Sequence, residues 1–149
     1  MTRVVALADS LRWEPNAPEA VLSTDDGARA VLALNPHFDD GDQSAVVLLW
    51  RGVYSASMGY PNDEGRRDHS LYHSGLNTLV WMGEVQGGPQ VPRPFGPQPR
   101  HFLLPLKETV VEVLADSYAV VRILGSTRDA MTAALSLDWN SVQFRFGES

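Results

Sequence analysis

The chain has 149 residues, of which 44% are apolar and 20% charged, the balance of a globular domain. It contains no cysteine, which excludes disulfides, thiolate catalysis and cysteine-ligated zinc or iron–sulfur sites. Its net charge is −6, and a single lysine stands among the twelve basic residues, so nucleic acid is excluded as an expected partner.

No apolar run approaches the roughly 20 residues that a membrane-spanning helix needs. The first ten residues contain one arginine and an apolar run that ends at Asp9, which is shorter than the core of a signal peptide. We therefore expect a soluble, cytoplasmic protein that binds neither membranes nor nucleic acid. No glycine-rich phosphate loop is present, so no organic cofactor is expected.

Short runs rich in β-branched residues predict strands along most of the chain. In chain order, the first of these are residues 3–7, 28–34, 45–50, 53–58 and 79–85, with a helical turn near 18–22. Residues 45–50 are six consecutive apolar residues, which is typical of a strand covered on both faces. Trp50 and Trp81 fall within predicted strands, which favours a packing role in the core.

Two more runs, residues 109–115 and 118–124, are separated only by Asp116 and Ser117, which predicts a β-hairpin. Glu112 and Arg122 each interrupt the apolar pattern of one run, so we expect them to pair across this hairpin. A last strand is predicted over 142–146, where apolar and polar residues alternate.

One helix is predicted near residues 127–136, since Ser126 stands three places before Asp129 and an alanine-rich run follows. The fold class is therefore mainly β (α+β): an antiparallel sandwich or a rolled, barrel-like sheet with this helix packed on it. Residues 86–100 hold five prolines and three glycines, which predicts a surface loop within a single domain spanning 1–149.

Polar residues concentrate in two segments between predicted strands, 35–42 and 61–76, where functional residues usually lie. We expect the first segment to be a solvated turn. The second carries the candidates for general acid–base catalysis and, together with a later histidine, the candidates for ligand binding. The catalytic candidates are Asp63, Glu64, His69 and Tyr72, and the ligand-binding candidates are Asn62, Arg66 and His101.

These residues fit three functions. The first is a small β domain that binds a small molecule or a protein partner through segment 62–73. The second is a cofactor-independent isomerase, cyclase or hydrolase that uses Glu64 or His69 as general acid or base. The third is a metal site formed by His37, His69 and His73, although the residue after His69 is serine rather than the glutamate of the strong zinc motif.

Three elements of the sequence resemble a group of small bacterial proteins to which no activity is attached. They are Pro61-Asn62-Asp63-Glu64, then His69-x-Leu71-Tyr72-x-x-Gly75-Leu76, and His101-Phe102 followed by a strand that ends Glu112-Val113-Leu114-Ala115. The chain departs from the group at Ser70, where proline is usual, and at Lys107–Glu108, where His-Asp is usual. The resemblance implies no catalytic residue.

Overall fold

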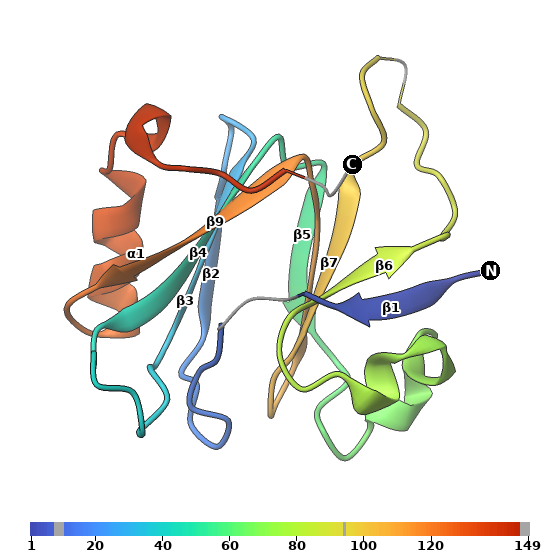
Figure 1. Ribbon diagram of the computed structural model, residues 1–149, viewed down its shortest axis with the longest axis horizontal. Helices are drawn as coiled ribbons and strands as arrows, with labels where there is room; N and C mark the ends of the chain where they lie inside the picture. The colour runs from blue at the N-terminus through green and yellow to red at the C-terminus, as the bar shows by residue number, and fades with distance from the viewer. Residues whose placement is uncertain (8–10, 94, 147–149) are drawn as a thin grey trace.

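The computed structural model of the protein describes residues 1–7, 11–93 and 95–146. The strands of these residues form two antiparallel sheets that face each other and are not closed into a barrel (Figure 1). The five-stranded sheet has the order β1 (Arg3–Ala6), β6 (Gly83–Gln86), β7 (Arg100–Pro105), β8 (Val110–Ala115) and β5 (Ser55–Gly59). The four-stranded sheet has the order β2 (Val21–Asp25), β3 (Arg29–Leu34), β4 (Ala45–Arg51) and β9 (Ser117–Ile123). The predicted sandwich is confirmed.

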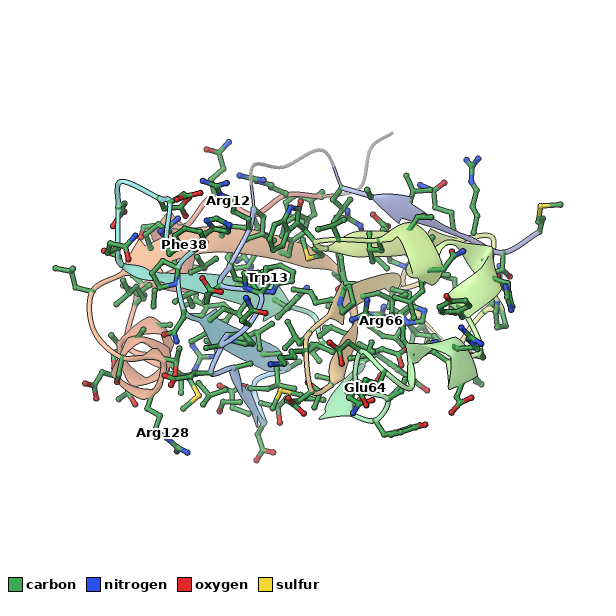
Figure 2. All side chains as sticks on the ribbon, turned by 90° about the horizontal axis from the view of Figure 1, so that it is seen from below. Arg12, Trp13, Phe38, Glu64, Arg66 and Arg128 are labelled. Carbon is green, nitrogen blue, oxygen red and sulfur yellow. The ribbon has the colours of Figure 1, made fainter. Side chains whose placement is uncertain are left out.

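The main core lies between the two sheets, where alternate residues of each strand point inward. Strand β4 contributes Val46, Leu48 and Trp50, all of which are fully buried. The core also includes Phe102 and Leu104 from β7, and Val111 and Val113 from β8. Trp13 lies in the same cluster, in the middle of the molecule in Figure 2, with its ring against the edge of the partly buried Trp81.

The other face of the four-stranded sheet is covered by α1 (Thr127–Leu135), the α-helix predicted for this region. Ala45, Val47 and Leu49 of β4 pack there against Ala130 and Ala134 of the helix. Strand β4 is therefore buried on both faces, which explains its unbroken apolar sequence. Helix α1 begins as predicted, because the Ser126 side chain accepts a hydrogen bond from the Asp129 N–H at 3.1 Å.

The predicted hairpin across Asp116 and Ser117 is wrong. Strand β8 pairs with β5 and β7 in the five-stranded sheet, whereas β9 pairs with β4 in the four-stranded sheet. The link lacks the Asn-Gly or Gly residues that a two-residue hairpin turn favours. Instead it carries the chain from one sheet to the other, with the Asp116 N–H bonded to the Arg51 carbonyl.

Three smaller predictions also need correction. The turn predicted near 18–22 is replaced by strand β2, and the strand predicted at 79–85 is shorter and begins at Gly83. The strand predicted at 142–146 is wrong: these residues follow the 3-10 turn Trp139–Ser141 and make one isolated bridge, from Arg145 to Tyr118. Phe144 packs under the helix instead.

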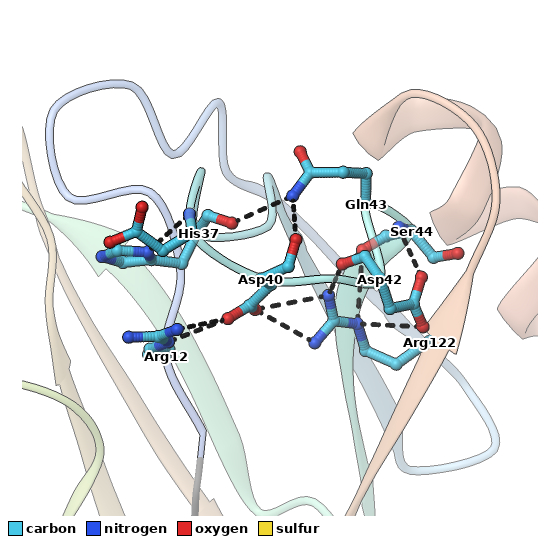
Figure 3. A network of polar contacts seen from close by, with 8 residues as sticks. Arg12, His37, Asp40, Asp42, Gln43, Ser44 and Arg122 are labelled. Atoms are coloured by element: carbon cyan, nitrogen blue, oxygen red, sulfur yellow. Dashed lines mark hydrogen bonds and ion pairs between the residues drawn. The ribbon is translucent and has the colours of Figure 1, made fainter.

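Charged side chains fix the loop between β3 and β4 (Figure 3). Asp40 accepts a hydrogen bond from Arg12 at 2.9 Å and contacts Arg122 at 3.4 Å. Arg122 also donates to the Asp42 carbonyl at 2.6 Å. Burial pushes the pKa of Asp40 upward, but the two guanidinium groups outweigh this effect and hold the pKa below its ordinary value. Arg122 thus ties this loop to β9, and its predicted pairing with Glu112 is wrong.

The described residues include no helix with both the length and the apolar character that crossing a bilayer requires.

The cap of α1 can be tested by mutation. We predict that Ser126→Ala lowers the free energy of unfolding by about 1 kcal/mol, because the Asp129 N–H loses its acceptor. Urea denaturation measures the change. The control is Ser136→Ala at the other end of the helix, where the hydroxyl makes only a 3.4 Å contact, and it should change stability much less. Equal losses in the two variants would contradict the capping role.

Candidate functional site

The outward face of the five-stranded sheet is covered at one end by a run of 3-10 turns. These are Arg66–Asp68, Tyr72–Ser74 and Leu76–Thr78, drawn in green beside β1 in Figure 1. The run buries Leu76 and Leu79 against Leu103 of β7 and Val110 of β8. It also packs closely on β1, because Gly75 has a φ of +130° and a Cβ there would lie 2.7 Å from the Val4 carbonyl oxygen. Only glycine fits this contact.

Beyond this covered end, the same face of the sheet carries polar side chains. In the register of β7 and β8, Leu103 is opposite Glu112 and His101 is opposite Leu114. Residues opposite each other and two apart along a strand share a face, so His101 and Glu112 are diagonal neighbours on the outward side. Sequence alternation alone therefore turns both groups away from the core.

Glu112 bridges two histidines. One carboxylate oxygen lies 3.0 Å from Nε2 of His101, and the other lies 3.0 Å from Nε2 of His69. His69 reaches the sheet from above, since it follows the first 3-10 turn in an extended conformation. Its side chain is 8% exposed, compared with 28% for His101 and 34% for Glu112. The arrangement joins a loop residue to two neighbouring strands.

The hydrogen bonds determine which nitrogen of His69 carries the proton. The Leu71 N–H donates to Nδ1 of His69 at 3.0 Å, so this nitrogen holds a lone pair. Nε2 therefore carries the hydrogen and donates to Glu112. Both ring nitrogens are engaged in hydrogen bonds, so the neutral ring of His69 acts as a donor that orients the carboxylate.

His101 differs from His69 in one respect. Its Nε2 faces a carboxylate oxygen and so donates, but Nδ1 has no hydrogen-bond partner among the residues that the structure describes. The two N–H groups favour the ionised form of Glu112. The hydrogen bond from His101 has the largest effect and lowers the pKa of Glu112. Burial raises this pKa, but the hydrogen bonds from His101 and His69 together outweigh burial and bring the pKa below its ordinary value of 4.5.

A cavity of about 600 Å³ opens over this group, which is a typical size for a small-molecule site. The 3-10 turns contribute one wall with Ser70 and Leu71. The loop that joins β6 to β7 contributes the opposite wall, from Gly87 to Val91 and at Gln98 and Pro99. Its floor includes Val85, His101, Glu112 and Leu114. The loop is braced by Gln98, which accepts from the Val91 N–H at 2.8 Å and donates back to the Val91 carbonyl.

Of the candidates named from sequence, the structure brings only His69 and His101 together. Asn62 accepts a hydrogen bond from the Gly65 N–H at 2.8 Å and so shapes its own turn. Asp63 and Glu64 are exposed, and the backbone N–H of Asp63 is bonded to the Lys107 carbonyl. None of these three residues lines the cavity.

Arg66 and Tyr72 also lie outside the cavity. The partly buried guanidinium of Arg66 donates to the Leu106 carbonyl at 3.2 Å, and its Nε is buried without an acceptor. Figure 2 shows Arg66 near Glu64, in the half of the molecule away from Arg128 of the helix. Tyr72 is half-buried and packs edge-to-face on the ring of His73.

The three histidines of the metal hypothesis have different surroundings. His37 stacks on Phe38 in the loop after β3, His69 binds Glu112, and His73 is exposed beside Tyr72. Within residues 1–7, 11–93 and 95–146, no group of three or more His, Cys, Asp or Glu side chains is arranged to hold a metal ion.

Glu112 is the site residue that sequence reasoning assigned incorrectly, because it was paired with Arg122. The signal that pointed to it was an acid on the outward side of an otherwise apolar strand. Each histidine that contacts it comes from one of the sequence elements singled out above, as does Glu112 itself. Comparison with known proteins adds nothing to this site, since no family model, curated protein or solved structure matches the chain.

The carboxylate bridge predicts a pH-dependent stability. At neutral pH, Glu112→Gln should lower the free energy of unfolding by about 1–2 kcal/mol, because a hydrogen-bonded carboxylate is lost at a partly exposed position. The folded-state pKa of Glu112 is lowered, so its contribution is complete above 4.5 and is lost as the pH falls through the lowered value. The difference between wild type and variant should therefore shrink on acidification.

Urea denaturation between neutral pH and pH about 3 measures this difference. The matched control is Glu108→Gln, because Glu108 is exposed and has no ion-pair partner in the described part of the chain. A Glu112→Gln deficit that is the same at every pH would contradict the role given to the carboxylate.

Proposed function

We propose that the protein binds a small uncharged molecule in the cavity over the outward face of the five-stranded sheet. The cavity itself carries the proposal: about 600 Å³ of space is lined by apolar side chains together with a few polar ones, among them the hydrogen-bonded pair His101 and Glu112. Val85, Leu71 and Leu114 supply apolar contact area, while Nδ1 of His101 supplies an acceptor for a donor group on the ligand. The recognition surface is then formed by Ser70 and Leu71 of segment 62–73 and by the strands beneath them, rather than by the whole segment.

Charge indicates the class of ligand. The cavity lining contains the Glu112 carboxylate but neither lysine nor arginine. An anionic ligand would be repelled by Glu112 and would find no cation in the lining to offset its desolvation. Arg66, the cation among the ligand-binding candidates named from sequence, lies outside the lining. An uncharged ligand with an N–H or O–H donor fits the lining best.

Ligand-detected NMR with matched sets of uncharged and carboxylate-bearing fragments tests the proposal. We expect uncharged fragments with a hydrogen-bond donor to bind and their carboxylate counterparts not to bind. Leu114→Trp should abolish binding, because the indole would fill the cavity floor. Leu124→Trp makes the same exchange at a residue that is 83% exposed and outside the lining, and it should bind as wild type does. Binding that survives Leu114→Trp, or no fragment binding at all, would overturn the proposal.

A further inference from the structure

The ring of His101 has one nitrogen, Nδ1, without a hydrogen-bond partner in the described part of the chain. Its Nε2–H is committed to Glu112 at 3.0 Å, which leaves the lone pair on Nδ1 of the neutral ring. No described residue donates to that nitrogen, and the ring belongs to the cavity lining. His69 shares the same carboxylate but has its Nδ1 engaged by the Leu71 N–H. Both ring nitrogens of His69 are thus hydrogen-bonded, whereas Nδ1 of His101 has no partner among the described residues.

We propose that the cavity is a catalytic site in which Nδ1 of His101 acts as general base on an uncharged substrate, transferring a proton from one atom of the substrate to another. This inference rests on the proposed function, because the substrate must first enter the cavity. It assigns His101 as the catalytic residue, with Glu112 and His69 as positioning residues.

The contacts explain how Glu112 positions His101 and supports proton transfer to its ring. When Nδ1 takes a proton, the ring becomes an imidazolium, and the carboxylate 3.0 Å from Nε2 stabilises that positive charge. His69 holds the second carboxylate oxygen at the same distance, so Glu112 cannot rotate away from His101.

The reaction consumes no other reagent. The base removes a proton from a substrate carbon next to a carbonyl group, and the electron pair of the C–H bond moves into the substrate to form an enolate. The imidazolium then returns the same proton to a different atom, which gives an isomer and regenerates His101. No oxidant, reductant or second substrate is required, and the base ends as it began.

The substrate class follows from the lining. The carbonyl compound should be uncharged, since the cavity contains a carboxylate and no cationic side chain. The side chains of Ser70 and Gln90 border the same space and have no partner among the described residues. Their donor groups suit an oxygen that gains negative charge as the proton leaves.

Proton transfer can be tested with 5-nitrobenzisoxazole, an uncharged compound whose ring opens when a suitably placed base removes a proton from it. The base removes the ring C–H proton, the N–O bond breaks, and a coloured cyanonitrophenolate forms, so absorbance reports the rate. Wild-type protein should react about 10²-fold or more faster than an equal concentration of free imidazole. His101→Gln should lose this acceleration.

His73→Gln is the matched control, since His73 is an exposed histidine that lies on the run of 3-10 turns and outside the cavity. It should react at the wild-type rate. A wild-type rate no higher than that of His101→Gln, zero included, overturns the proposal. Fragment binding that persists in that case shows that the cavity binds ligands without catalysis, whereas loss of both results removes the proposed function as well.

Glu112→Gln gives a readout that a purely structural role would not produce. His69 can only donate from Nε2, so the glutamine oxygen must turn to His69 and its NH2 group must face His101. His101 then accepts at Nε2 and carries its hydrogen on Nδ1, which leaves neither ring nitrogen with a free lone pair. We expect a rate loss of about 10²-fold or more, together with a reversed His101 tautomer in long-range 1H–15N NMR spectra. Wild-type spectra in which Nδ1 of neutral His101 already carries the hydrogen would overturn the proposal without any substrate.

Discussion

Glu112 stands on a strand whose other residues are valine, leucine and alanine, and a carboxylate there needs partners because it is partly removed from water. Its partners come from two places: His101 from the next strand and His69 from a loop more than forty residues earlier in the chain. The carboxylate thereby anchors the 3-10 run to the sheet at one end, while Leu76 and Leu79 anchor it by apolar packing at the other. The cavity exists between this anchored run and the loop after β6.

His69 and His101 have the same side chain and contact the same carboxylate, but their other hydrogen-bond partners differ. A single backbone N–H, that of Leu71, engages Nδ1 of His69 and limits this ring to donating toward Glu112. His101 has no such contact in the described part of the chain, and its ring is more exposed. A residue type alone therefore says little about reactivity, because the partner of each ring nitrogen decides whether a lone pair remains.

Local sequence patterns predicted an element correctly where its composition follows from its own burial or its own cap. The six apolar residues of β4 indicated burial on both faces, and Ser126 marked the start of α1. The signals failed at Asp116 and Ser117, because alternation predicts which residues share a face but not which sheet a strand joins. That error paired Glu112 with Arg122. His69 and His101 were chosen for their chemistry, but the register of β7 and β8 and the loop packing that unite them with Glu112 involve long-range contacts that no local pattern encodes.

Strand β1 has four residues and occupies an edge of its sheet, where it pairs with β6. It nevertheless supports the 3-10 run through the contact of Val4 with Gly75, and Thr2 just before it borders the cavity. Short edge strands fray at a fraction of the free energy of complete unfolding. Detachment of β1 would loosen one wall of the site while the core between the sheets stays packed. The shape of the cavity therefore depends on a short edge strand as well as on the packed core.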